Sequence, residues 1–429
     1  MTSGIALVVF GALIVSLVLT VPIGFSLGIA SLSYILYTKQ LTFGFITQNL
    51  VTGADSFPIM AIPFFVFAGE LMGGGGISRR LLNVANVYFG RIQGGLAIVT
   101  VVVCMFFAAI SGSGPATVAA VGGMVVPTMI QKGYDKKFVL ALIAAAGSIG
   151  VIIPPSIPMV VYSVTTNSSV SKLFMAGFIP GIIIGIVLIG YSYYYARKMG
   201  YKGDTEPFSV KRAVKETWDA KWALLSPVII LGGIYGGIFT PTEAAAVSVI
   251  YSLVIGCLVY KEMNFKQLLN VTKNACETTA TILIVIGCAA GFSKVLTLGR
   301  IPTTVATFLT SLTDSKIIIL LLINVLLLIV GCFMETLCAI MILAPILFPV
   351  VTAMGVDVRH FGIIMVVNLA IGFITPPLGV NLFVASRVGE TTLDNVIKGI
   401  IPFLVLMIVT LLLITYVPAI SLFLPSILS

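Results

Sequence analysis

The stretch Gly150-Val-Ile-Ile-Pro-Pro155 decides the fold, because it recurs 222 residues later as Gly372-Phe-Ile-Thr-Pro-Pro377. The same offset, without gaps, joins Pro127 with Pro349, Asp135 with Asp357, Gly177 with Gly399, and Pro180 with Pro402. Self-similarity at one fixed spacing indicates a duplicated structural unit. We therefore expect a first repeat at 1–198, a polar connector at 199–221, and a second repeat at 222–429.

Both repeats are strongly apolar. Of the 429 residues, 59% are hydrophobic and 9% are charged, and the mean hydropathy is +1.16. Soluble domains carry about 25% charged residues, so a soluble chain of this composition would expose too much apolar surface. Runs of about 18 or more apolar residues recur along the chain, each long enough to cross the hydrocarbon core of a bilayer. The sequence predicts an all-α polytopic membrane protein.

Several kinds of chemistry are excluded by what the sequence lacks. The six cysteines form no CxxC pair and His360 is the only histidine, which argues against disulfides, haem and zinc. The chain has no Walker motif for ATP and no catalytic Ser/His/Asp arrangement. We expect no enzymatic activity, no organic cofactor and no nucleic-acid partner. The net charge of +9 is expected on loops that face anionic membrane lipid.

Each repeat is predicted to contain three spans, an amphipathic arm, a re-entrant hairpin, a broken span and a closing span. In the first repeat these are 4–20, 22–38, 55–74, 77–92, 93–130, 137–165 and 174–196. In the second they are 222–241, 244–261, 276–293, 297–315, 316–354, 361–387 and 399–424. With the hairpins re-entrant and the N-terminus periplasmic, the second repeat is inverted. Eighteen of the 24 Lys and Arg residues then lie on the cytoplasmic side, as the positive-inside rule requires.

Two kinds of segment interrupt helices at membrane depth, and each occurs once per repeat. Such backbone survives only where protein or a cavity surrounds it. The double prolines at 154–155 and 376–377 remove N–H donors, so the helix should unwind and free carbonyl oxygens that suit sodium. The hairpin tips, Ser111–Thr117 and Gly331–Thr336, allow tight turns. The half-helix after each tip then points its positive dipole end towards an anion.

Glycine and proline also kink ordinary membrane helices. A single break would favour that interpretation, but two kinds of break, each present in both halves of an inverted repeat, favour a transporter binding site.

Single side chains leave alternatives open. Glu335 either attracts a cation or faces a water-filled vestibule. Asn381, one turn past the second double proline, is placed to offer an amide. Arg387 pairs with a lipid phosphate, a helix C-terminus or a substrate carboxylate. Glu70 and Glu243 lie near span ends, where snorkelling or helix capping is the simpler interpretation.

Motifs along essentially the whole chain resemble one family. They are Val21-Pro-Ile-Gly-Phe-Ser-Leu-Gly, Pro63-Phe-Phe-Val-Phe-Ala-Gly-Glu-Leu-Met, Ser111-Gly-Ser-Gly-Pro-Ala-Thr, Ile153-Pro-Pro-Ser-Ile-Pro, Lys172-Leu-Phe-Met-Ala-Gly, Phe239-Thr-Pro-Thr-Glu-Ala and Thr375-Pro-Pro-Leu-Gly-Val-Asn-Leu-Phe-Val-Ala. Together they resemble the large membrane subunit of the tripartite ATP-independent periplasmic (TRAP) transporters. The resemblance implies an inverted-repeat, elevator-type transporter in the bacterial inner membrane, with a small four-helix membrane subunit and a periplasmic binding protein as partners.

The resemblance also implies a set of site residues. Family sodium sites correspond here to Ser111, Ser113, Gly150, Ile153, Pro155, Gly331, Thr336, Gly372 and Thr375. We expect substrate contacts at Ser156, Glu335, Asn381 and Arg387. The second tip lacks the serine-glycine richness of the first, and Arg387 departs from the small residue that is usual after Asn-Leu-Phe-Val-Ala-Ser.

The function expected from these patterns is sodium-coupled import of a small organic anion, a carboxylate such as sialic acid or a C4-dicarboxylate, delivered by the binding protein. One alternative is a stand-alone ion antiporter, channel or anion/sodium symporter that works without a binding protein. An intramembrane enzyme should show a catalytic dyad at matched depth, and the sequence contains none.

Overall fold

The computed structural model describes residues 2–39, 41–203, 208–313 and 315–428, and every regular element in these ranges is helical. Seven of the described helical segments are long and apolar enough to cross a membrane. The helices of the first half are α1 (Thr2–Val18), α2 (Ile23–Thr38), α3 (Gly44–Ala54), α4 (Ala61–Gly74), α5 (Ile77–Phe89), α6 (Gly95–Ser111), α7 (Gly114–Gln131), α8 (Lys136–Ser148), α9 (Ile157–Thr165) and α10 (Val170–Met199).

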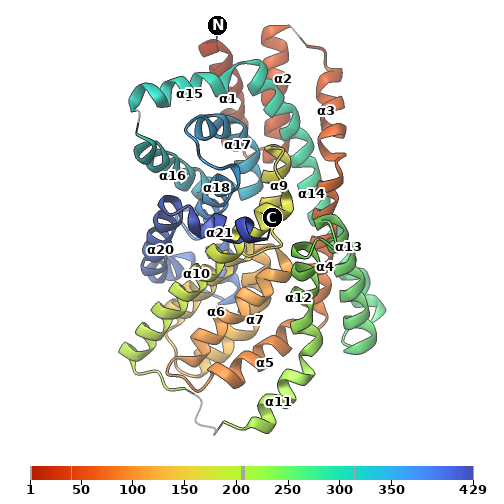
Figure 1. Cartoon of the computed structure of the whole chain (residues 1–429), viewed down its shortest axis with the longest axis vertical. Helices are drawn as coiled ribbons and strands as arrows, with labels where there is room; N and C mark the ends of the chain where they lie inside the picture. The colour runs from red at the N-terminus through yellow and green to blue at the C-terminus, as the bar shows by residue number, and fades with distance from the viewer. Residues whose placement is uncertain (1, 40, 204–207, 314, 429) are drawn as a thin grey trace.

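The rest of the chain repeats this order. Its helices are α11 (Val210–Asp219), α12 (Lys221–Tyr235), α13 (Pro241–Leu253), α14 (Phe265–Leu298), α15 (Ile301–Leu312), α16 (Lys316–Phe333), α17 (Thr336–Ala353), α18 (Val358–Gly372), α19 (Val380–Val388), α20 (Leu393–Tyr416) and α21 (Ala419–Ile427). Helical hairpins α6–α7 and α16–α17 correspond, as do the broken helices α8/α9 and α18/α19. Helices α5 and α15 lie near opposite ends of the molecule (Figure 1), so the two halves run in opposite directions.

The broken helices α8 and α18 form the centre of the molecule. Every residue from Phe138 to Ser148 and from His360 to Gly372 is buried. Each helix begins at an aspartate, and the carboxylates of Asp135 and Asp357 accept bonds from the second backbone N–H of the helix, at 3.0 and 2.8 Å. Such caps satisfy amide groups that would otherwise lack a partner at a helix start. The matching caps show that the sequence offset of 222 has a structural counterpart.

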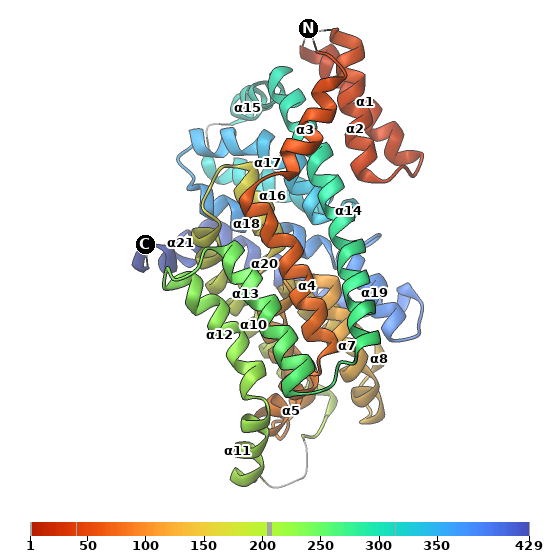
Figure 2. The ribbon, with the colours of Figure 1, turned by 90° about the vertical axis from the view of Figure 1, so that its right-hand side faces the viewer.

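Helices α4 and α14 pack side by side and form a wall along one side of the hairpins (Figure 2). Gly69 in α4 allows close approach, since a Cβ there would lie 3.2 Å from the Cα of Ser111 at the first hairpin tip. We call α4 and α14 the wall helices.

The expected boundaries hold for one wall helix and not for the other. The span expected at 55–74 is the segment Phe57–Gly74, which a separate helix, α3, precedes. The span expected at 276–293 is the 34-residue α14, whose polar first turns carry no apolar run that could be recognised. The polar connector contains a helix, α11. The division into units at residues 198 and 222 stays a prediction.

Candidate functional site

The first hairpin tip is a compact hydroxyl-rich turn between α6 and α7. Gly112 has φ of +60°, a conformation that suits glycine. The Ser113 carbonyl accepts bonds from the Thr117 hydroxyl at 2.7 Å and the Thr117 N–H at 3.2 Å. The Ser111 hydroxyl lies 3.2 Å from that of Thr117. These bonds fix the tip in one shape beneath the wall helices.

The first unwound segment lies directly against this tip. A Cβ on Gly150 would lie 2.6 Å from the Ser113 carbonyl oxygen, and a Cβ on Gly112 would lie 2.8 Å from the Pro155 carbonyl oxygen. Only glycine permits backbone to approach this closely. Ser156 is fully buried and caps α9: its hydroxyl donates to the Val151 carbonyl at 2.6 Å and accepts from the Met159 N–H. Residues 151–160 are all buried.

The second tip repeats this contact with different chemistry. A Cβ on Gly372 would lie 2.5 Å from the Gly331 carbonyl oxygen. The Glu335 carboxylate accepts from the N–H groups of Leu337 and Cys338, at 3.0 and 3.4 Å. The positive end of α17 is therefore already occupied by a carboxylate of the same chain, which differs from the open anion site expected there. Thr336 is 1% exposed and its hydroxyl has no partner in the described part of the chain.

The two halves meet at the start of α7. A Cβ on Gly114 would lie 3.1 Å from the Phe373 ring and 3.4 Å from the Asn381 Oδ1. The amide nitrogen of Asn381 donates to the Ala144 carbonyl of α8, so this side chain of the second half contacts the broken helix of the first. Its Oδ1 is buried and has no hydrogen-bond partner among the described residues. Buried oxygens of this kind ordinarily find a partner, so a bound cation or water is expected here.

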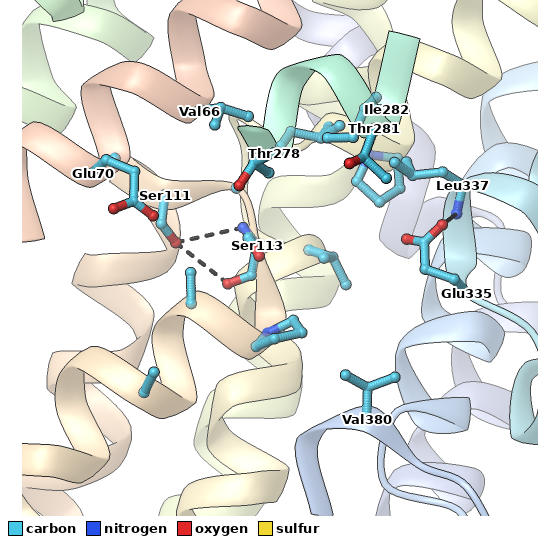
Figure 3. Close-up of a pocket in the computed structure, with 18 of the residues that line it drawn as sticks. Val66, Glu70, Ser111, Ser113, Thr278, Thr281, Ile282, Glu335, Leu337 and Val380 are labelled. Carbon is cyan, nitrogen blue, oxygen red and sulfur yellow. Dashed lines mark hydrogen bonds between the residues drawn. The ribbon is translucent and has the colours of Figure 1, made fainter. Parts of the chain in front are cut away.

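A cavity of about 920 Å³ separates the two tips from the wall helices (Figure 3). Four hydroxyls line it, those of Ser111 and Ser113 on the first tip and Thr278 and Thr281 on α14. Among the described lining residues, the only charged side chains are two carboxylates, Glu335 on the second tip and Glu70 on α4. The cavity therefore attracts cations and, by itself, repels anions.

The structure groups the predicted residues unequally. Of the predicted set, Ser111, Ser113 and Glu335 line the cavity. Behind the tips lie the buried Gly150, Ile153, Pro155, Ser156, Gly331, Thr336, Gly372 and Asn381, with Thr375 half-buried. Arg387 is exposed near the end of α19 and does not line the cavity.

Sequence reasoning missed three polar residues on the wall helices. Glu70, interpreted as a capping or snorkelling residue, faces the cavity near Ser111 (Figure 3). Thr278 and Thr281 lie on α14 in the stretch Glu277-Thr-Thr-Ala-Thr281, which forms no motif that indicates a cavity. For Glu243 the capping interpretation is confirmed, because it forms a capping box with Thr240.

No group of three or more His, Cys, Asp and Glu side chains in the described residues is arranged to hold a metal ion. The oxygens at and beside the tips are instead hydroxyls, an amide, backbone carbonyls and the carboxylate of Glu335, which suit a monovalent hard cation such as sodium. The unpartnered Thr336 Oγ1 and Asn381 Oδ1 fit this donor set.

Residues 10–420 match the family described as the DctM component of the tripartite ATP-independent periplasmic transporters. Because this match spans nearly the whole chain, the protein belongs to that family. It is accordingly a multi-pass protein of the inner membrane.

Individual relatives support the assignment. The chain is 52% identical to the isethionate TRAP transporter permease protein DctMQ of Oleidesulfovibrio alaskensis, covering 97% of this chain but 66% of that longer protein. It is 43% identical to the C4-dicarboxylate TRAP transporter large permease protein DctM of Pseudomonas aeruginosa, covering 94% of both. It is 37% identical to the sialic acid TRAP transporter large permease protein SiaM of Vibrio cholerae, covering 94% of this chain and 95% of that one.

A solved structure supports the fold alone. The YdaH transporter of Alcanivorax borkumensis, described as having an unusual topology, superposes with a TM-score of 0.61 at 16% identity, over 88% of each chain.

Proposed function

We propose that this chain imports a small organic anion by sodium-coupled symport, receiving it from a periplasmic binding protein and working with a small four-helix membrane subunit. The observation that carries the proposal is the pair of unwound segments, each in backbone contact with a hairpin tip, beside buried oxygens that lack partners. Transporters place coupling ions at such segments. No catalytic step is assigned to the chain.

Electrostatics support a strict dependence on sodium. The charged side chains of the described cavity lining are the carboxylates of Glu70 and Glu335, so an organic anion entering the cavity meets like charge. Sodium bound at the tips supplies the positive charge that the side chains lack. Each sodium ion moving down 100 mV releases about 2.3 kcal/mol, and two such ions per anion would support steep accumulation.

We propose that the hairpins move against the wall helices. The cavity is lined by the C-terminal half of α4 and the N-terminal half of α14, the halves nearest α5 (Figure 2). Basic residues gather at that end, which positions it in the cytoplasm. In this conformation the cavity opens on the cytoplasmic side, and an elevator-type displacement of the hairpins and broken helices along the wall would carry the site to the periplasm.

The relatives' names suggest three classes of anion to compare, namely isethionate, C4-dicarboxylates and sialic acid. They share a small size and a negative charge.

The test is uptake of these three anions into proteoliposomes that contain this chain and the small subunit, with and without the binding protein. We expect uptake of one anion that needs both the binding protein and external sodium. Unchanged uptake with potassium in place of sodium would show that uptake is not coupled to sodium. Full uptake without the binding protein would favour a stand-alone symporter.

A further inference from the structure

Helix α11 in the connector packs against the body of the protein chiefly through the arm helix α5. Ala213 is 4% exposed and α11 packs on the arm helix α5, where the Thr217 hydroxyl lies 3.1 Å from that of Tyr88. The helix lies at the lower end of the molecule in Figure 1, directly before α12. Another side of the helix carries exposed apolar side chains.

The open side of α11 carries an apolar stripe. Val210, Val214 and Trp218 are 67%, 62% and 66% exposed. Their spacing of four residues places them on one face of the helix. Phe208, just before the helix, is 47% exposed and adds a second aromatic ring. Water does not favour so many large apolar side chains in one short segment, so this face is expected to be covered.

Basic residues follow the edge of the stripe. At 100° per residue, Lys211 and Lys215 lie on the side of the stripe away from Ala213, and both are exposed. The Lys221 ammonium lies 3.6 Å from the centre of the Trp218 ring. A basic edge beside an apolar face with tryptophan is the pattern of a helix that lies in the membrane interface.

We propose that α11 binds anionic phospholipid of the cytoplasmic leaflet, with the Val210–Val214–Trp218 stripe in the acyl boundary and Lys211, Lys215 and Lys221 at the headgroups. Trp218 precedes the apolar helix α12 by three residues, or about 4.5 Å at 1.5 Å per residue, so it lies at headgroup depth. Each lysine near an anionic surface adds to the electrostatic attraction. The proposal depends on the membrane location of the chain and not on its substrate or its coupling ion.

The protein contains a built-in reporter for this site. Its two tryptophans are Trp218 and Trp222, so Trp222→Phe leaves Trp218 as the sole tryptophan. We would place this variant of the full chain in nanodiscs of phosphatidylcholine and phosphatidylglycerol, with bromine on the acyl chains of one lipid at a time. Quenching of tryptophan fluorescence then reports which lipid contacts Trp218.

We expect at least twofold more quenching by brominated phosphatidylglycerol than by brominated phosphatidylcholine at equal mole fraction. In the same background, Lys211→Gln with Lys215→Gln should reduce that preference to near one, with phosphatidylcholine quenching retained. The matched control is Lys172→Gln with Lys294→Gln, two exposed lysines on the side expected to be periplasmic, which should leave the preference unchanged.

Three results would overturn the proposal. Equal quenching by the two lipids would remove the anionic selectivity. Quenching by aqueous iodide in place of bromolipid would show that the stripe faces water or a soluble partner. Protection from both quenchers would show that protein covers it, either the small subunit or a second copy of the chain.

Discussion

The two unwound segments have the same origin in sequence and opposite exposure. Residues 151–160 of the first half are completely buried, whereas Pro377, Leu378 and Val380 of the second are exposed. Both segments follow a capped, buried helix and both contact a hairpin tip. The double proline therefore sets where the helix breaks, and the neighbouring tip sets whether the break is closed.

The chemistry of the tips accounts for this difference. The first tip is built from serine and glycine, so its backbone packs against Pro155 and closes the segment. The second ends in Met334 and Glu335, and its carboxylate turns back to cap α17 beside the cavity (Figure 3). We infer that the first half holds its site closed while the second provides access.

The largest effect is expected from adding a methyl group at the closed contact. Gly150→Ala places Cβ 2.6 Å from the Ser113 carbonyl and the Thr117 hydroxyl, and neither can retreat because the segment is buried. Uptake should fall at least 100-fold. Gly372→Ala places Cβ 2.5 Å from the backbone carbonyl of Gly331, so uptake by this variant should fall by a comparable factor.

The control is Gly123→Ala, where nothing lies within 4 Å of the new Cβ; its uptake should stay within twofold of wild type. Normal uptake by Gly150→Ala, at wild-type amounts of folded protein, would contradict the closed site.

A smaller effect is expected from the unpartnered hydroxyl of Thr336. Thr336→Val should raise the sodium concentration for half-maximal uptake about tenfold, equivalent to about 1.4 kcal/mol, because an ion ligand is lost. Thr117→Val at the first tip removes a hydroxyl that already has a partner, so it should lower thermal stability and shift the sodium dependence less than threefold. Thr336→Ser keeps the oxygen and should resemble wild type. Equal sodium dependence in the valine and serine variants would exclude Thr336 as a ligand.

The two carboxylates that line the cavity, Glu70 and Glu335, differ in their structural roles. One charge about 8 Å from a cation in a wet cavity is worth about 0.5–1 kcal/mol, so Glu70→Gln and Glu335→Gln should each raise the half-maximal sodium concentration about two- to fivefold. Only Glu335→Gln should also lower the unfolding temperature, because Glu335 caps α17. Glu277→Gln, on an exposed face of α14, is the control for both. If Glu70→Gln lowered the unfolding temperature and Glu335→Gln did not, the structural role assigned to Glu335 would be wrong.

The smallest effect concerns the caps of the two broken helices. The Arg359 guanidinium, 2.6 Å from Asp357, holds the pKa of that carboxyl below its usual range. A lowered folded-state pKa stabilises the protein above the unfolded value of about 3.9, and the stabilisation is lost as pH falls through the folded value. Asp357→Asn keeps the cap but not the ion pair, so it should lower the unfolding temperature by about 1–2 °C at pH 7.

That difference should vanish once the pH lies below the lowered folded-state pKa of Asp357. Asp135→Asn, whose cap in the described residues is a backbone hydrogen bond and not an ion pair, should show no difference at either pH. If Asp357→Asn lowered the unfolding temperature by the same amount at both pH values, the effect would come from the cap and not from the ion pair.

The offset of 222 residues and the double prolines were enough to predict the hairpins and broken helices, because a proline pair stops a helix whatever surrounds it. The residues that line the wall side of the cavity could not be predicted from the sequence. Glu70, Thr278 and Thr281 sit in apolar helices, and their direction depends on how α4 and α14 pack against the tips, which no local pattern encodes. Arg387 is the opposite case. It was noticed in the sequence because the family motif usually has a small residue there, yet it does not line the cavity.

The size of the cavity has an electrical consequence. At about 30 Å³ per molecule, 920 Å³ holds about 30 waters. In the proposed inward-open arrangement, water in the cavity would carry the cytoplasmic potential inward, so most of the voltage would fall across the thin layer of protein at the two tips. A sodium ion bound there, as proposed, would then cross most of the membrane field in a short displacement.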